Sequence, residues 1–247
     1  MAVSSVELLN VGWFTVAAGI CRQGDDLDRR VRFPIPAFLI ETDSEKILVD
    51  TGLHPAAAES SRIRYGDAQG VRVFELEQDA SVADQVDLST ITMVVLTHLH
   101  FDHAGGLELV PQSVPIVVQR REWEAAHDAA AIERNFYLTV DYAAVDARRL
   151  TLVEGDHDLL GDGSIHLLST PGHTPGHQSV RVGDRLVLGA DVTHFASGLD
   201  DHRFPTFADD FEAQRASAER LRELRDAGAM VVPGHDPGHL RRGRLPL

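Results

Sequence analysis

The 247-residue sequence contains a single cysteine, Cys21. One cysteine excludes an intrachain disulfide bond, and it excludes a metal site built from several thiolates. A chain without disulfides suits a reducing compartment, so we expect a cytoplasmic protein in which Cys21 is an inert core thiol. Any metal ion must therefore be held by histidine and carboxylate side chains.

Positive charge is also scarce, because 23 Lys and Arg residues stand against 38 Asp and Glu residues, for a net charge of −15. Nucleic-acid binding requires clustered positive charge, so nucleic acid is not an expected partner. The short basic stretch at Arg241, Arg242 and Arg244 is interpreted as a solvated C-terminus.

Long apolar runs are missing as well. The most apolar stretch near the N-terminus, residues 11–20, is too short to cross a bilayer, and it lacks the flanking features of a signal peptide. We therefore expect a strand there and no membrane partner. Since no linker or internal repeat interrupts the chain, we predict a single domain over residues 1–247.

Short apolar runs bounded by polar or glycine-containing segments predict a mixed α/β protein. The predicted strands are residues 6–16, 36–41, 46–50, 91–96, 115–119, 164–169, 185–188 and 231–232. The charged segment 24–32 is expected to be a hairpin loop, and a helix is predicted over 120–131. A second helix is predicted over 209–227, with Asp209 as its N-cap and Gly228 after its end.

Four metal-ligand side chains follow the predicted strand 91–96 within six residues: His98, His100, Asp102 and His103. Residues two apart in a loop point the same way, so His98 and His100 can share one ion. Asp102 and His103 can then turn toward a neighbouring ion. Imidazole and carboxylate ligands suit Zn²⁺, and also Mn²⁺, Fe²⁺ or Co²⁺.

Three further polar residues, His173, Asp191 and His235, each follow a predicted strand within a Gly- or Pro-containing turn. Functional side chains are commonly placed in the loops at strand ends, so these residues are expected to join the first cluster. The sequence thus predicts a metal site that is assembled from four separate loops.

Taken together, these ligands and the turn Asp50-Thr51-Gly52 resemble the metallo-β-lactamase superfamily across essentially the whole chain. The resemblance implies an α/β fold (α+β in some schemes), a four-layer αβ/βα sandwich with the metal site at one edge. More narrowly, residues 98–106 and 169–179 look like those of the N-acyl-homoserine lactonase family.

The resemblance implies a role for each ligand. His98, His100 and His173 would hold metal one, His103, His235 and Asp102 would hold metal two, and Asp191 would bridge them. A hydroxide between two divalent ions, zinc in the first instance, would then attack a small lactone or ester, and Asp102 would pass a proton to the leaving group. The implied substrate is an N-acyl-homoserine lactone, so the role would be quorum quenching.

One position departs from the lactonase pattern. Where those enzymes commonly have a tyrosine that hydrogen-bonds the substrate carbonyl, this chain has His194, whose imidazole could also donate. The departure leaves open another lactone, an aryl ester, a thioester or a phosphotriester as substrate. A mononuclear iron dioxygenase of the same superfamily is a further alternative, whereas Asp191, where β-lactamases often have cysteine, argues against a β-lactam.

Several supporting roles are left open by the sequence. His177 is expected to pack behind the His173 turn, Asp236 is a candidate to orient His235, and Phe101 is either a pocket wall or a packing residue. The pocket is expected to be lined from residues 54–80 and 125–150. A homodimer is compatible with the sequence.

Overall fold

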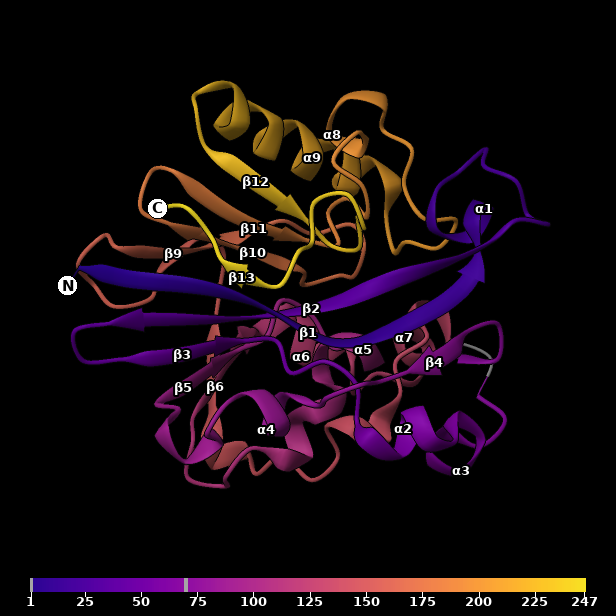
Figure 1. Cartoon of the computed structure of the whole chain (residues 1–247), viewed down its shortest axis with the longest axis horizontal. Helices are drawn as coiled ribbons and strands as arrows, with labels where there is room; N and C mark the ends of the chain where they lie inside the picture. Colours follow the sequence, from indigo (N-terminus) through magenta and orange to yellow (C-terminus); the bar gives the residue numbers. More distant parts are fainter. Residues whose placement is uncertain (1, 69–70) are drawn as a thin grey trace.

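The computed structural model describes residues 2–68 and 71–247. Two β-sheets face each other, with helices on the two outer sides (Figure 1). The larger sheet has the order β13 (Gly243–Arg244), β1 (Val3–Ala17), β2 (Arg30–Thr42), β3 (Lys46–Val49), β5 (Met93–Val95), β6 (Ile116–Gln119) and β7 (Leu150–Val153), and β4 (Glu75–Glu77) pairs with β1. The smaller sheet has the order β12 (Met230–Pro233), β11 (Leu186–Ala190), β10 (Gln178–Val182), β9 (Ile165–Ser169) and β8 (His157–Asp158).

The helices are mostly short. They are α1 (Ala18–Cys21), α2 (Pro55–Glu59), α3 (Ser61–Tyr65), α4 (Val82–Gln85), α5 (Phe101–Ala104), α6 (Arg120–Ala125), α7 (Ala129–Asn135), α8 (Gly198–Asp201) and α9 (Phe211–Asp226). Single 3₁₀ turns cover Leu88–Thr90, Gly105–Leu109, Thr139–Asp141 and Ala147–Arg149. Among the described residues, no helix has both the length and the hydropathy needed to cross a lipid bilayer.

Side-chain alternation along the strands creates the layers. In β3, Leu48 packs under the helices of the first half of the chain, whereas Ile47 and Val49 pack between the two sheets. In β11, Leu186 and Leu188 pack between the sheets, and Val187 packs against α9. Figure 1 shows the result, with α9 outside the smaller sheet and α2, α3 and α4 outside the larger one. The predicted four-layer αβ/βα fold is confirmed.

Several predicted boundaries are wrong for local reasons. The β1 strand ends at Ala17 and a turn of helix follows it, so residues 18–20 are not a strand, and β2 begins at Arg30, inside the predicted loop. The predicted helix 120–131 is two helices, because the Asp128 side chain accepts the Ala131 amide and starts α7 anew.

The N-cap of the last helix lies one residue later than predicted, and α9 begins at Phe211. The side chain of Asp210, not that of Asp209, accepts the amides of Glu212 and Ala213 and caps α9. Asp209 instead accepts hydrogen bonds from Arg134 and Asn135. Two adjacent aspartates can each serve as a cap, and only the backbone geometry distinguishes them.

Two expectations about single segments are met. Cys21 is fully buried in α1, and burial raises the pKa of its thiol well above the ordinary value, as expected for an inert core cysteine. The three arginines near the C-terminus are exposed, although the backbone of Arg244 pairs with Glu7 at the sheet edge.

Candidate metal centre and pocket

The structure brings all seven predicted ligands together where four strands end. His98 to His103 lie in the loop after β5 and in α5, and His173 lies in the turn between β9 and β10. Asp191 directly follows β11, and His235 lies two residues after β12. None of the seven residues is more than 7% exposed, so the cluster is almost entirely shielded from water.

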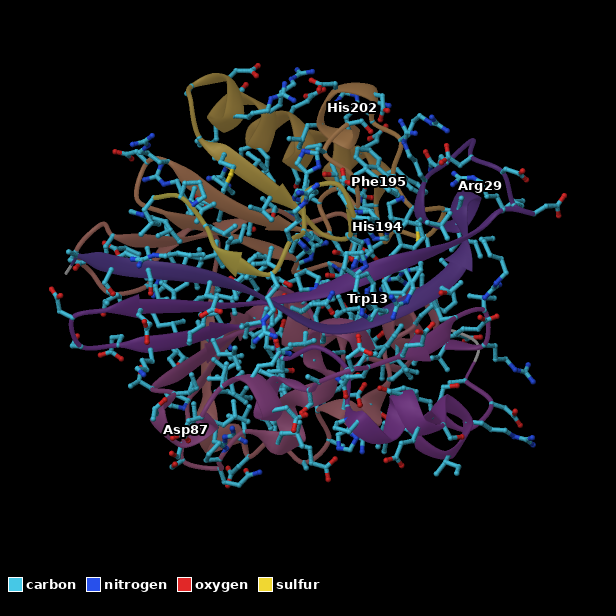
Figure 2. The ribbon with its side chains drawn as sticks, viewed as in Figure 1. Trp13, Arg29, Asp87, His194, Phe195 and His202 are labelled. Atoms are coloured by element: carbon cyan, nitrogen blue, oxygen red, sulfur yellow. The ribbon has the colours of Figure 1, made fainter. Side chains whose placement is uncertain are left out.

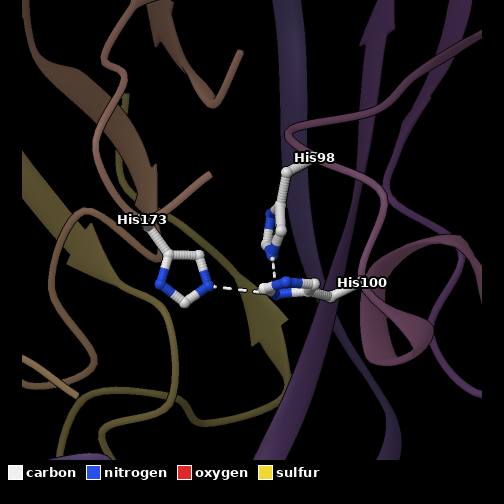
Figure 3. Close-up of side chains that lie close together, drawn as sticks. All are labelled: His98, His100 and His173. Carbon is white, nitrogen blue, oxygen red and sulfur yellow. Dashed lines mark hydrogen bonds between the residues drawn. The ribbon is translucent and has the colours of Figure 1, made fainter. Parts of the chain in front are cut away.

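Three histidines form the first group of ligand atoms. His98 Nε2 and His173 Nε2 each lie 3.1 Å from His100 Nδ1 (Figure 3). Nitrogens that share one ion at bond lengths of about 2.0–2.1 Å in a tetrahedral site are about 3.3 Å apart. The three rings are therefore placed as ligands of one ion would be.

The second group contains His103, His235 and Asp102. His235 Nε2 lies 3.4 Å from Asp102 Oδ2, and His103 Nε2 lies 3.8 Å from the same oxygen. Asp191 stands between the two groups. Its Oδ2 lies 3.3 Å from His173 Nε2, and its Oδ1 lies 3.5 Å from His103 Nε2.

These residues fit divalent cations. His103 Nε2 and Asp191 Oδ1 are buried, and neither has a hydrogen-bond partner among the described residues. An unsatisfied buried polar group costs about 1–3 kcal/mol, so a cluster of them requires a compensating partner. Imidazole nitrogens and carboxylate oxygens that converge within 4.8 Å supply a donor set that Zn²⁺ and similar ions prefer.

In four of the histidines, the ring nitrogen that points away from the cluster lies within hydrogen-bond distance of an oxygen atom. His100 Nε2–H donates to the Asn135 carbonyl (2.8 Å), and His235 Nδ1–H donates to the Pro34 carbonyl (2.9 Å). His103 Nδ1–H donates to Asp50 Oδ2 (2.8 Å), and His98 Nδ1 lies 3.1 Å from the Thr97 hydroxyl. Such bonds fix the tautomer and leave the inward nitrogen free to bind metal.

Asp236 does not orient His235, contrary to one expectation. Its carboxylate accepts the backbone amides of Ala196 (3.1 Å) and Gly238 (2.8 Å) instead. The Pro34 carbonyl takes the orienting role because β2 passes directly behind the His235 turn.

Burial and charge set the protonation of the ligands. Burial lowers the pKa of His98, His100 and His173, which favours the neutral, metal-binding form. For His103 and His235, burial acts in the same direction, but neighbouring aspartate carboxylates outweigh it and raise the pKa. In the absence of metal, protons on these two rings therefore compensate the buried carboxylates.

His177 packs behind the His173 turn, as expected. Its Nδ1–H donates to the Thr170 carbonyl (3.1 Å), and its Nε2 accepts the backbone amide of Asp191 (3.1 Å). Only the neutral ring can make both bonds, and burial lowers the pKa of His177 to about 3. His177 thus ties the bridging aspartate to the turn that carries His173.

The pocket over the ligands is lined mainly by aromatic side chains. It has a volume of about 350 Å³, and Phe14, Phe74, Phe101, Phe136 and Phe207 form its walls. Four of the buried ligand residues, His100, Asp102, Asp191 and His235, also line it. Phe101 is both a pocket wall and a packing residue, because its ring also contacts Tyr65 and Phe74.

Sequence reasoning located part of this pocket. Phe74 and Phe136 come from the two expected segments, but Phe14 and Phe207 come from β1 and from the loop before α9. No sequence signal marked them, because a phenylalanine in a strand, such as Phe14, usually belongs to the core, and Phe207 lies in a loop without a motif. His54 lies outside the pocket and accepts the Ala56 amide as the cap of α2.

Comparison with known proteins decides the family. Residues 30–235 match the sequence profile of the metallo-beta-lactamase superfamily. The chain belongs to that superfamily. It is 31% identical to the N-acyl homoserine lactonase AttM of Azorhizobium caulinodans, over 87% of this chain and 86% of the relative. It is 30% identical to an N-acyl homoserine lactonase of Bacillus cereus, over 83% of this chain and 82% of the relative.

Solved structures share the fold of this chain. An N-acyl homoserine lactone hydrolase with the product N-hexanoyl-L-homoserine at its catalytic metal centre is 25% identical, with a TM-score of 0.79 over 96% of this chain and 95% of that one. A quorum-quenching N-acyl homoserine lactone lactonase has a TM-score of 0.80 at 24% identity, over 96% and 94% of the two chains. The predicted class, a metal-dependent hydrolase, is confirmed.

His194 lies beside the cluster of candidate ligands in this superfamily member. Its Nε2 is 3.1 Å from Asp191 Oδ2, its ring faces the pocket, and its Nδ1 has no hydrogen-bond partner among the described residues. Figure 2 shows His194 inside the molecule, whereas Asp87 lies at its periphery. Together with His173 and Asp191 it also forms a group able to hold a metal ion, a feature that the sequence did not suggest.

Glu122 was missed by sequence reasoning. It lies in α6, where glutamate is an ordinary helix residue, yet it is fully buried. Burial raises the pKa of Glu122, and four hydrogen bonds counteract part of that rise. A glutamate three residues after the strand 115–119 was the only hint, and it is weak.

Proposed function

We propose that this enzyme hydrolyses the lactone ring of N-acyl homoserine lactones and thereby quenches quorum signals. The observation that carries the proposal is the aromatic pocket of about 350 Å³ that opens onto the ligand cluster. Such a pocket suits a substrate with a polar ester head and an apolar acyl tail, and its size is typical of small-molecule sites. The relatives at about 30% identity, which are N-acyl homoserine lactonases, support the same substrate class.

The metal ions are part of this proposal. His98, His100 and His173 would hold one ion, His103, His235 and Asp102 would hold the other, and Asp191 would bridge them. Two divalent ions, zinc in the first instance, would supply hydroxide near neutral pH and stabilise negative charge on the oxygens of the substrate. The two clusters of convergent ligand atoms on either side of Asp191 support a count of two.

His194 and Asp102 complete the proposed chemistry. Both line the pocket beside the ligand cluster. Burial lowers the pKa of His194, so the neutral ring carries a single N–H, which would become free for the substrate carbonyl once metal ions hold the Asp191 carboxylate, whose Oδ2 lies 3.1 Å from His194 Nε2. We assign to His194 the hydrogen bond to the substrate carbonyl and to Asp102 the transfer of a proton to the leaving alkoxide.

The deciding experiment combines metal analysis with pH-stat hydrolysis of a substrate panel. The panel contains homoserine lactones of several acyl lengths, a simple γ-lactone, an aryl ester, a thioester and a phosphotriester. We expect two divalent ions per chain and the fastest turnover with acyl-homoserine lactones. Faster turnover of another class would replace the substrate, and one iron per chain without ester hydrolysis would favour the dioxygenase alternative. A cytoplasmic location, a single-domain chain and a homodimer stay predictions from the sequence.

A further inference from the structure

The buried carboxylate of Glu122 accepts four hydrogen bonds. Its Oε1 accepts the Leu99 amide (2.9 Å) and the Tyr137 hydroxyl (2.9 Å). Its Oε2 accepts the Gly176 amide (2.9 Å) and the Thr174 hydroxyl (2.8 Å). Among the described residues, no cationic side chain forms an ion pair with Glu122. All four groups that donate to its carboxylate are neutral.

Three of the four donors, Leu99, Thr174 and Gly176, belong to the two loops that carry the first group of ligands, and Tyr137 follows α7. Leu99 lies between His98 and His100, and Thr174 directly follows His173. One loop leaves the larger sheet after β5, and the other joins β9 and β10 of the smaller sheet. Glu122 therefore links two segments that are distant from it in the sequence. Leu99 precedes it by 23 residues, and Thr174 and Gly176 follow it by 52 and 54 residues.

The fit between α6 and the His173 turn leaves no spare room. A Cβ atom added to Gly176 would lie 2.1 Å from the Glu122 amide nitrogen and 2.6 Å from its Cα. Such contacts are with backbone and could not be relieved by a side-chain rotation. On the opposite side, a Cβ on Gly172 would lie 2.1 Å from the amide nitrogen of Gln214 in α9. The turn is thus clamped between two helices.

We propose that Glu122 is a positioning residue that aligns His98, His100 and His173 by bonding the two loops that carry them. The proposal rests on the proposed function only in requiring metal ions at this centre. The second group of ligands has a separate support, since His103 bonds to Asp50. Loss of Glu122 should therefore weaken metal held by the three histidines more than metal held by the second group.

A glutamine cannot replace Glu122 at this position. Each carboxylate oxygen accepts one backbone N–H, from Leu99 on one side and from Gly176 on the other. Whichever way a glutamine amide is turned, its NH₂ group faces one of these N–H groups, and two donors cannot bond. The substitution keeps the size of the side chain and removes the link to one loop.

The test is chelator competition on the cobalt-loaded enzyme, followed by its visible absorption. We expect E122Q to release one of its two cobalt ions at about 10- to 100-fold lower chelator concentration than wild type, as for other residues that orient metal ligands. Y137F, which removes one donor to Glu122, should shift the release in the same direction. Y142F is the matched control, because that buried hydroxyl donates to the Ala126 carbonyl instead.

The outcomes separate positioning from mere stability. If E122Q releases cobalt as wild type does, even with a lower melting temperature, the proposal is overturned. If E122Q does not fold, equal release by Y137F and Y142F would overturn it. Cobalt release is measured without substrate, so inactivity of the metal-loaded wild type toward lactones would refute the proposed function and leave this inference standing.

Discussion

Replacing Asp50 by asparagine should weaken the second group of metal ligands selectively. Asp50 Oδ1 accepts the Thr97 amide (2.8 Å), and Oδ2 accepts both the Thr97 hydroxyl (2.8 Å) and His103 Nδ1–H (2.8 Å). All three partners are buried. An asparagine side chain has only one oxygen. Its NH₂ group must therefore take the place of either Oδ1 or Oδ2, where it is a hydrogen-bond donor.

Either orientation of the asparagine has a cost. If its NH₂ group faces His103, the ring must accept at Nδ1, and its proton moves to Nε2, the atom that should bind metal. If the NH₂ group faces Thr97, a buried backbone N–H loses its acceptor, at about 1–3 kcal/mol. The first outcome disturbs the partner of a metal-bound histidine, whose loss usually weakens metal affinity about 10- to 100-fold. The second lowers the stability of the loop, so the orientation facing His103 is the one that changes metal binding.

The assay is competition between the enzyme and a chromophoric chelator for zinc, with two binding constants resolved. We expect D50N to weaken one constant by about 10- to 100-fold and to leave the other near the wild-type value. D210N is the control, because the cap of α9 uses a single oxygen that asparagine retains. Two wild-type constants for D50N would refute the argument that His103 depends on Asp50 for its tautomer.

Three further outcomes are expected. Removal of metal by EDTA should abolish hydrolysis and lower the melting temperature, since saturation at 100 times Kd stabilises a protein by about 2.7 kcal/mol; an unchanged melting temperature would contradict a buried metal cluster. F207A should raise KM for a decanoyl lactone by roughly 10- to 100-fold, because contact that removes an aromatic side chain from water contributes about 1.5–3 kcal/mol, and should affect a butanoyl lactone less; equal effects on both would place the acyl chain elsewhere. The folded-state pKa of His177 is about 3, below an unfolded value of about 6.5, so the unfolded state binds the proton first and stability falls as pH drops from 6.5 toward 3. H177Q should flatten that slope by at most about 1.4 kcal/mol per pH unit in urea unfolding between pH 7 and 5, and an unchanged slope would exclude His177 as its source.

The parts of the fold that could be predicted are those with a strong local signal. The predicted strands 46–50, 115–119 and 164–169 match β3, β6 and β9 to within one residue at each end. These strands are largely buried on both faces, so apolar residues run without interruption. By contrast, α2, α3 and α4 have four or five residues each, too few to show a helical period.

The candidate site divides in the same way. The convergence of the seven candidate ligands could be predicted because histidines and aspartates rarely cluster at strand ends unless they share a site. Their supports could not be predicted, because Glu122 differs from any surface glutamate only in what folds around it. The bond between Asp50 and His103 joins residues 53 positions apart, and the Pro34 carbonyl that orients His235 is 201 positions away. Such contacts leave no local pattern in the sequence.

The loop that carries four of the ligands is fixed at successive residues from three directions. Gln178 Nε2 donates to the Leu96 carbonyl (2.8 Å), Asp50 accepts the Thr97 amide, and Glu122 accepts the Leu99 amide. None of these bonds involves a metal-binding atom, so the loop should keep its shape when metal is removed. Amide hydrogen exchange at Thr97 and Leu99 should then stay slow in the chelated enzyme. Rapid exchange at these two amides would instead mean that metal binding itself orders the loop, because the bonds from Asp50 and Glu122 would be too weak to hold it.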